Sequence, residues 1–160
     1  SPGNPLKPSA GMAPLAERMA GARRLADGRR IVATSVEASF GTRYSVDTLR
    51  VLRRRCPAVQ FVWVMGADNL RSFSRWQNWR GIANLMPMAV VDRMGSSLYA
   101  IGSRAPEALK RHRVPEQQAG SLASRKAPAW VYLHGLKSPL SSTALRALRK
   151  ASAKTSARGG

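Results

Sequence analysis

The chain has 160 residues, of which 44% are hydrophobic, a size and composition that suit one domain with a real core. Basic residues outnumber acidic ones by 27 to 8, and the formal net charge of +19 makes nucleic-acid binding a function to weigh. The one cysteine, Cys56, excludes a disulfide framework within one chain, and the lack of a signal-peptide pattern or an apolar run near ~20 residues predicts a cytoplasmic location and no membrane partner.

The first half of the chain alternates between helical and strand-like patterns. We predict a helix from Pro14 that Asp27-Gly28 ends, a strand over residues 31–36, a helix from a Ser45 cap to Arg55, and a strand over residues 59–65. The last of these runs is almost wholly apolar, as strands buried on both faces are.

The second half continues the alternation. We predict a helix over residues 79–85, a buried strand over 88–91, a charged helix over 106–113, a loop over 114–128, and a last strand over 130–133 that leads through Pro139 into a helix. Strands alternating with helices are typical of a parallel α/β sheet. We assign residues 1–150 to one domain and residues 151–160 to a flexible basic tail.

Hydroxyl groups cluster at the start of the last predicted helix. Ser141, Ser142 and Thr143 follow Pro139, and Arg146 lies three residues beyond Thr143 on the same helical face. Exposed N–H groups and the positive end of a helix dipole attract phosphate, and a guanidinium can fork onto the same oxygens. The run therefore predicts an anion clamp, although such a run alone is more often an ordinary helix cap.

A second candidate site follows the apolar run over residues 59–65. Gly66 would let a ligand approach the backbone, and Asp68, at the start of the next helix, could accept hydrogen bonds from a ribose. Carboxyl ends of parallel strands are where open α/β sheets bind ligands. Taken singly, a turn glycine and a capping aspartate are the simpler interpretation.

Two tryptophans, Trp76 and Trp79, lie three residues apart and are expected on one face of a short helix beyond that strand. An indole face can stack on a flat heteroaromatic ring and favours a pyridinium cation. We expect this role for Trp76 and core packing for Trp79.

Taken in order, these segments resemble the nicotinate-mononucleotide adenylyltransferases of bacterial NAD synthesis, within the nucleotidyltransferase superfamily. The similar segments are Ser1-Pro2-Gly3-Asn4-Pro5-Leu6-Lys7, Arg43-Tyr44-Ser45-Val46-Asp47-Thr48-Leu49, Gly66-Ala67-Asp68, Phe73-Ser74-Arg75-Trp76 and Leu140-Ser141-Ser142-Thr143-Ala144-Leu145-Arg146. The resemblance runs from residue 1 to about residue 150 and implies a Rossmann-like open parallel sheet with helices on both faces.

The resemblance also implies a reaction, in which the phosphate of nicotinate mononucleotide attacks the α-phosphorus of ATP, forms deamido-NAD and releases pyrophosphate. Mg²⁺ would be carried by the ATP phosphates. The implied ATP-binding residues are Gly66, Asp68, Ser142, Thr143 and Arg146, with Arg93 as a weaker candidate. The implied residues for the mononucleotide are Trp76, the backbone near Tyr44 and Ser45, and Asn4 and Lys7.

The family's catalytic signature, Gly-x-Phe-x-Pro-x-His-x-Gly-His, has no counterpart in the sequence. The two histidines cannot replace its histidine pair, because His112 lies in a basic run that we expect to be solvated and His134 ends a strand as a satisfied edge residue. We therefore assign no catalytic residue and leave open whether the chain alone is active. We also expect the family's first strand and helix to be missing, which would leave inner sheet edges unpaired.

Two other functions stay open. A sister adenylyltransferase acting on phosphopantetheine would share the clamp and the fold, but would not need Trp76 as a pyridine platform. A basic nucleic-acid or polyanion binder ranks second, because the basic residues are scattered and no zinc-ligand set or RNA-binding aromatic signature accompanies them. We expect no specific nucleic-acid partner, only non-specific polyanion binding; the oligomeric state is not predicted.

Overall fold

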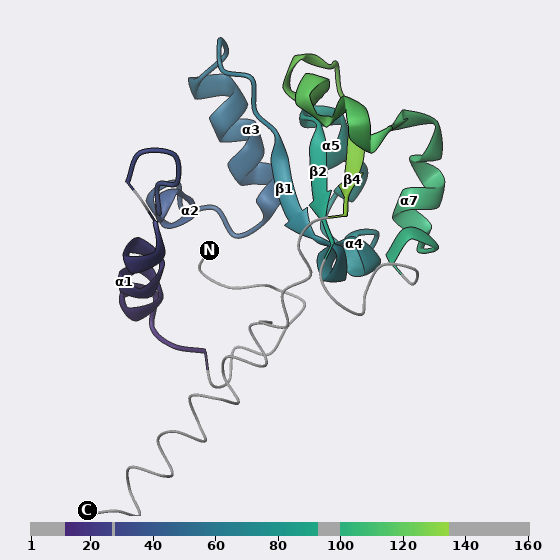
Figure 1. Ribbon diagram of the computed structural model, residues 1–160. Helices are drawn as coiled ribbons and strands as arrows, with labels where there is room; N and C mark the ends of the chain where they lie inside the picture. Colours follow the sequence, from purple (N-terminus) through teal and green to yellow (C-terminus); the bar gives the residue numbers. More distant parts are fainter. Residues whose placement is uncertain (1–11, 27, 93–99, 135–160) are drawn as a thin grey trace, which may run out of the picture.

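The computed structural model describes residues 12–26, 28–92 and 100–134. The described strands form an all-parallel sheet in the order β1-β2-β4-β3. Figure 1 shows β1, β2 and β4 side by side. The strands are β1 (Trp63–Gly66), β2 (Met88–Val91), β3 (Arg113–Val114) and β4 (Trp130–Leu133). The parallel sheet with its helices confirms the predicted α/β class.

In the described ranges, three helices precede β1 and the other helical segments lie between successive strands. The helices are α1 (Leu15–Leu25), α2 (Val36–Ser39), α3 (Ser45–Arg55), α4 (Ala67–Phe73), α5 (Trp79–Leu85) and α7 (Arg104–Ala108), with the 3₁₀ helices η1 (Lys110–His112) and η2 (Glu116–Ser124). None of the helices in the described ranges has the length and apolar character that crossing a membrane requires.

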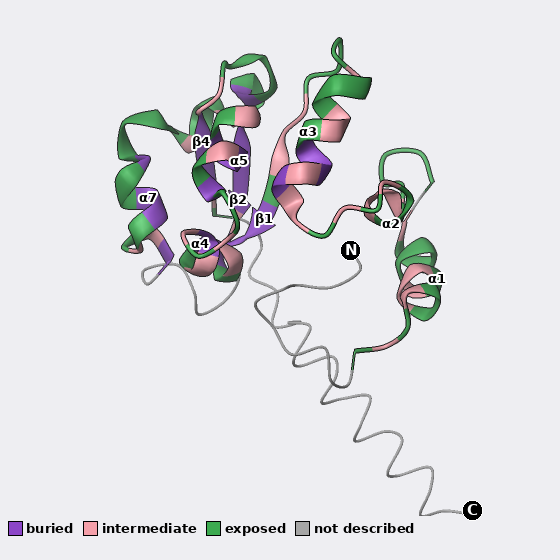
Figure 2. Ribbon diagram, turned by 180° about the vertical axis from the view of Figure 1, so that it is seen from behind, coloured by how far each residue is buried: buried purple, intermediate pink, exposed green. Residues whose placement is uncertain are grey.

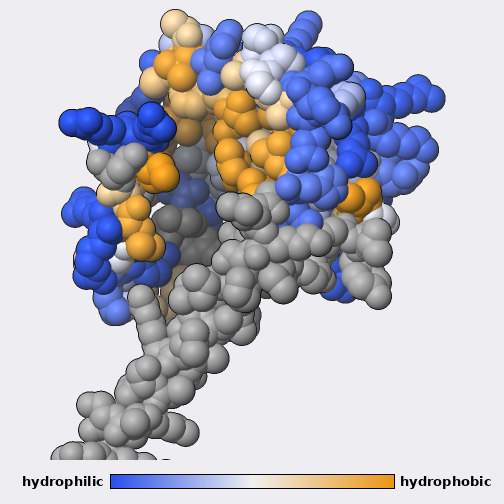
Figure 3. Space-filling view, viewed as in Figure 1, coloured by the Kyte–Doolittle hydropathy of each residue, from blue (hydrophilic) through white to orange (hydrophobic). Residues whose placement is uncertain are grey.

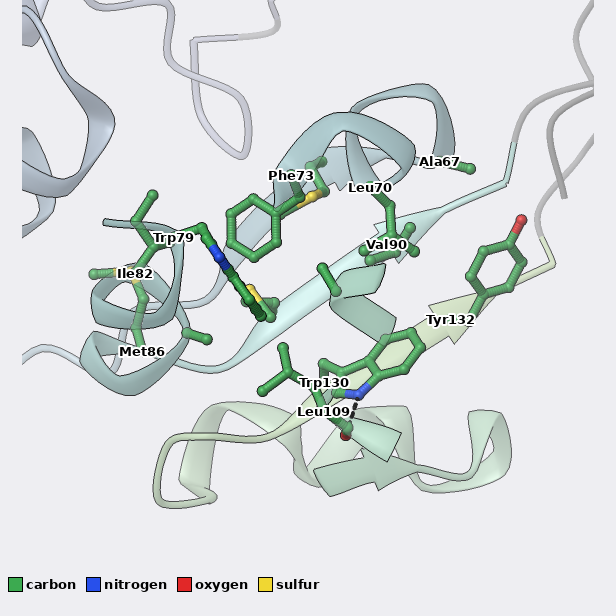
Figure 4. Close-up of a cluster of buried hydrophobic side chains, with 14 of the residues drawn as sticks. Ala67, Leu70, Phe73, Trp79, Ile82, Met86, Val90, Leu109, Trp130 and Tyr132 are labelled. Carbon is green, nitrogen blue, oxygen red and sulfur yellow. Dashed lines mark hydrogen bonds between the residues drawn. The ribbon is translucent and has the colours of Figure 1, made fainter. Parts of the chain in front are cut away.

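The main hydrophobic core lies on one face of the sheet. Alternate strand residues point toward it, because successive side chains of a strand leave on opposite faces. Its fully buried members include Val90, Trp130 and Tyr132 from the strands and Leu70, Phe73 and Ile82 from α4 and α5 (Figure 4). The indole N–H of Trp130 donates a 2.9 Å hydrogen bond to the carbonyl of Leu109, which satisfies its one polar atom inside this core.

A smaller core lies on the opposite face. Ala89 and Val131 pack there against Leu122 of η2, so helical segments cover both faces of the central strands. Val64 of β1 also belongs to this face by alternation but is 61% exposed, and Figure 3 shows apolar surface at the middle of the molecule.

Three predicted elements agree with the structure to the residue. The helix over residues 79–85 is α5, and the strands over 88–91 and 130–133 are β2 and β4. The strand predicted over 59–65 exists but spans Trp63–Gly66, and the helix predicted from Ser45 is α3, with Tyr44 rather than Ser45 as its N-cap.

The strand predicted over residues 31–36 is wrong. Residues 31–35 form neither helix nor strand, and Val36 begins α2. A strand is stabilised by a hydrogen-bonded neighbour, and none of the described strands pairs with this segment. Ile31 and Val32 are accordingly 62% and 64% exposed. The helix α1 also has no buried residue, and it lies with α2 to one side of the sheet (Figures 1 and 2).

The region between β2 and β4 is more regular than predicted. The charged helix expected over 106–113 is a short α7, followed by η1 and then β3. The loop expected over 114–128 contains the last residue of β3 and the nine-residue η2. Leu122 anchors η2 in the smaller core, which its polar surroundings in the sequence obscured.

Candidate functional site at the carboxyl edge of the sheet

The strands β1, β2 and β4 end level with one another. Gly66 pairs with Val91, and Val91 pairs with Leu133. The next residues of the three strands therefore form one row at the carboxyl edge, where parallel sheets bind their ligands. This row consists of Ala67, Asp92 and His134.

Gly66 and Asp68 occupy the β1 end of this edge, as the sequence predicted. Gly66 is buried with φ of −77°, so the turn from β1 into α4 does not require a left-handed glycine. Ala67 is fully buried, and Asp68 follows as an exposed residue in the first turn of α4. Asp68 does not cap α4, because Gly66 is the N-cap and the helix start has no side-chain capping hydrogen bond. Its carboxylate is thus available to a ligand at this edge.

Trp76 and Trp79 are not on one helix, which corrects the prediction. Trp76 lies in the turn after α4, and Trp79 is the first residue of α5. Asn78 separates them: it adopts a left-handed conformation with φ of 47°, and its side-chain oxygen accepts a 3.1 Å hydrogen bond from the N–H of Gly81. An N-cap with that backbone conformation ends one helical path and begins another.

Both indoles contact Phe73 edge to face. The ring centroids are 5.7 Å apart for Trp76 and 5.8 Å apart for Trp79. Trp79 is 7% exposed and belongs to the main core, as expected. Trp76 is half-buried against that core, and its indole nitrogen is a buried atom without a hydrogen-bond partner among the described residues. Trp76 therefore combines a fixed ring with an unused donor.

Tyr44 and Ser45 mark the start of α3. The carbonyl of Tyr44 accepts hydrogen bonds from the N–H groups of Asp47 and Thr48, at 3.1 and 3.3 Å. The ring of Tyr44 packs against the main core, as Trp76 does, and the same core contains Ala67. One hydrophobic cluster thus supports the predicted residues of β1, α3 and the turn after α4.

The row also contains a buried polar pair that the sequence reasoning missed. Asp92, directly after β2, is 3% exposed, and its Oδ1 accepts a 3.0 Å hydrogen bond from the hydroxyl of Tyr132. In Figure 4 this hydroxyl points away from the hydrophobic side chains, toward the end of β4. A carboxylate that directly follows an apolar strand was the available signal.

His134 and Glu116 form a second pair at the β4 end. Glu116 accepts from the backbone N–H of His134 through Oε1 and contacts Nδ1 through Oε2, both at 2.7 Å. The hydrogen bond with the His134 ring is the main cause that lowers the pKa of Glu116 below its ordinary value. His134 is satisfied at Nδ1, as predicted, and His112 of η1 is exposed. Glu116 was not foreseen, because it fell in a segment predicted to be a loop.

Six predicted site residues lie outside the described residues: Asn4, Lys7, Arg93, Ser142, Thr143 and Arg146. The anion clamp of Ser142, Thr143 and Arg146 and the roles assigned to Asn4, Lys7 and Arg93 therefore stay sequence predictions. Among the residues that the structure describes, no three His, Cys, Asp or Glu side chains are grouped so that they could hold a metal ion. The described part of the site offers aromatic surface, hydroxyl and carboxylate groups, suited to positioning an organic substrate.

Comparisons with known proteins place the chain in a family. Residues 1–148 match the cytidylyltransferase-like family model. The probable nicotinate-nucleotide adenylyltransferase of Bradyrhizobium sp. strain BTAi1 is 56% identical over 146 residues, which are 91% of this chain and 76% of that protein. The proteins of the same name from Methylorubrum extorquens and Brucella abortus are 53% and 50% identical, over 91% and 96% of this chain and 79% and 80% of their own lengths. The chain belongs to the nicotinate-nucleotide adenylyltransferase family of cytidylyltransferase-like proteins.

Proposed function

We propose that this chain binds ATP and nicotinate mononucleotide and positions them for adenylyl transfer in NAD biosynthesis. In this reaction a phosphate oxygen of the mononucleotide forms a bond to the α-phosphorus of ATP. The bond between that phosphorus and the oxygen that bridges the α- and β-phosphates breaks, so the products are deamido-NAD and pyrophosphate. Such a displacement depends on positioning and charge neutralisation and requires no covalent intermediate on the protein.

The observation that carries the proposal is that Gly66 and Asp68 lie at the end of β1, while the half-buried ring of Trp76 packs against the same hydrophobic core that contains Ala67. The buried Gly66–Ala67 backbone leads to an exposed carboxylate, and the half-buried indole follows one helix later. We assign the nucleoside of ATP to Gly66 and Asp68 and the pyridine ring to Trp76. Tyr44 and Ser45 would receive the pyridine carboxylate through the first backbone N–H groups of α3, which an α-helix leaves without intrahelical partners.

The phosphates are assigned to residues outside the described ranges. Ser142, Thr143 and Arg146 would hold the ATP phosphates, with Arg93 as a further contact, and Asn4 and Lys7 would reach the mononucleotide phosphate. Mg²⁺ would enter with ATP, where it neutralises phosphate charge. The net charge of +19 suits two anionic substrates and also predicts non-specific polyanion binding, which salt should abolish. A cytoplasmic location is part of the proposal, because ATP is the substrate and the chain has a single cysteine.

Binding is the primary test, because the paired histidines of the family signature are not among these 160 residues. Isothermal titration calorimetry would measure the affinities of the purified chain for ATP and for nicotinate mononucleotide, with deamido-NAD formation followed in parallel. We expect both ligands to bind and turnover to be slow or absent. Failure of both ligands to bind at moderate salt would overturn the proposal.

Substitutions of Trp76 test whether the second substrate is nicotinate mononucleotide or phosphopantetheine. Trp76→Ala should weaken nicotinate mononucleotide about tenfold, since base stacking on an aromatic side chain contributes ~1–3 kcal/mol, whereas Trp76→Phe should keep most of the affinity. ATP affinity should not change in either variant. Tighter binding of phosphopantetheine than of nicotinate mononucleotide would instead identify the sister activity.

A further inference from the structure

His134 lies in the row of the sheet edge that contains the proposed nucleotide site. The N–H of Asp92 donates to the carbonyl of Leu133 at 2.8 Å, so the hydrogen-bonded register continues to the last residue of β4. Adjacent strands are ~4.8 Å apart, which places the backbone of His134 about 10 Å from that of Ala67. One extended nucleoside triphosphate can span this distance.

The His134 ring is held from two sides. A carboxylate only accepts hydrogen bonds, so Nδ1 is the donor to Glu116. The ring of Tyr132 packs beside the imidazole, with centroids 5.0 Å apart. The side chain is nevertheless 55% exposed, and within the described ranges the structure gives no hydrogen bond to Nε2. The imidazole is therefore oriented but keeps one nitrogen for a ligand.

Glu116 does more than satisfy the backbone. Its Oε1 already accepts the backbone N–H of His134, and its Oε2 independently fixes the ring. Other charges nearby are Arg113, whose guanidinium lies 5.4 Å from the Trp130 ring centroid and 6.0 Å from that of Tyr132, and Asp92, which accepts the Tyr132 hydroxyl. When the imidazole is protonated, both nitrogens donate, so Nε2 can donate to an anion while Nδ1 stays on Glu116.

We propose that His134 contacts a phosphate group of ATP through Nε2, and that Glu116 is the positioning residue that orients it. The assignment rests on the proposed function, because it takes ATP as the ligand of this edge. It adds a binding residue directly after β4 to those at the end of β1, so that the nucleotide would lie across the ends of several strands rather than at the end of one. A charge-assisted hydrogen bond of this kind is shorter and stronger than a neutral one.

Replacing His134 by asparagine or by glutamine tests the two nitrogens of its ring one at a time. In His134→Asn, the amide nitrogen takes the place of Nδ1, so the Glu116 contact is kept and the outer donor is lost. In His134→Gln, the amide nitrogen takes the place of Nε2. Calorimetric titration with ATP and with inorganic tripolyphosphate should show an affinity loss of about tenfold for the Asn variant and a much smaller loss for the Gln variant. His112→Asn, at the exposed histidine of η1, is the matched control and should bind as the unchanged chain does.

Glu116→Gln tests the positioning role. This substitution should weaken ATP binding in the wild-type chain. It should have no further effect in the His134→Asn variant, because Glu116 acts on ATP through the His134 ring. An equal loss in both backgrounds would show a general structural effect and overturn that role. Thermal unfolding of every variant identifies any that fail to fold.

The outcomes distinguish this inference from the proposed function. If the unchanged chain binds ATP and His134→Asn binds it equally well, the His134 assignment is wrong and the proposed function stands. If the Asn and Gln variants lose affinity equally, the Nε2 contact is wrong. If the unchanged chain binds neither ATP nor nicotinate mononucleotide, both proposals fail.

Discussion

The hydroxyl of Tyr132 donates a 3.0 Å hydrogen bond to Oδ1 of Asp92, which joins β4 to the residue directly after β2. Both residues are almost fully buried, at 1% and 3% exposure. A buried carboxylate is tolerated only when it is hydrogen-bonded or paired, so this bond stabilises the carboxyl edge from within. It also fixes the ends of β2 and β4 relative to each other along the strand direction.

Tyr132→Phe should therefore lower the free energy of unfolding by about 1–3 kcal/mol, because the carboxylate loses a donor while the ring still fills its place. Urea unfolding monitored by circular dichroism would measure the loss. Tyr44→Phe is the control: Tyr44 is only half-buried, and we expect a change within ~0.5 kcal/mol. Equal stability of the two variants would mean that the Tyr132 bond contributes little.

The stability of the fold should depend on which residue replaces Asn78. Asn78→Ala loses the cap on Gly81 and puts alanine, which adopts the left-handed backbone less readily than asparagine, at that position, so we expect a loss of about 2 kcal/mol. Asn78→Gly loses the cap but tolerates the backbone, and we expect a few tenths of a kcal/mol. Chemical denaturation of both variants checks this order. A loss that is the same in both would argue against backbone strain.

Asp68 and Asp47 offer a matched pair for the nucleotide site. Both lie in the first turn of a helix, but Asp47 is paired with Arg50 at 3.0 Å on α3. Asp68→Asn should weaken ATP binding severalfold because it removes the proposed ribose acceptor, whereas Asp47→Asn should not change it. Calorimetry under one salt condition measures both. Unchanged affinity in Asp68→Asn would remove Asp68 from the site.

The Glu116–His134 pair predicts a pH dependence with a defined sign. Because the pKa of Glu116 is lowered in the folded chain, its ionised form stabilises the fold above the ordinary value of 4.5. That contribution is lost as the pH falls through the lower folded-state pKa. The difference in thermal midpoint between the unchanged chain and Glu116→Gln should therefore shrink on acidification. Glu107→Gln, measured in the same series, accounts for general acid effects; a constant difference would contradict the prediction.

The sequence predicted the interior strands well because their signal is local. The segments over 88–91 and 130–133 are short apolar runs that end at polar residues, and each has a parallel neighbour on both sides. Residues 31–36, where apolar residues alternate with short ones, also have a strand-like pattern but pair with none of the described strands. A strand depends on its neighbours, so its own residues cannot decide whether it forms.

The candidate site was predictable where one segment suffices and not where two must meet. Gly66 and Asp68 lie at the strand end that the pattern indicated. The separation of Trp76 from Trp79 depends on one left-handed residue, Asn78, which helical periodicity does not reveal. The pairing of Glu116 with His134 joins residues 18 positions apart, and only the register of β3 beside β4 brings them together.

The level ending of β1, β2 and β4 also limits how this protein can change in evolution. A one-residue slip of β4 would turn Trp130 and Tyr132 to the opposite face and carry His134 away from Asp92. The register of β4 thus determines both the packing of its side chains in the core and the position of His134 beside Asp92. For the proposed site, substitutions that repack the middle of β4 are consequently expected to alter both the free energy of unfolding and the ligand affinity at the end of the strand.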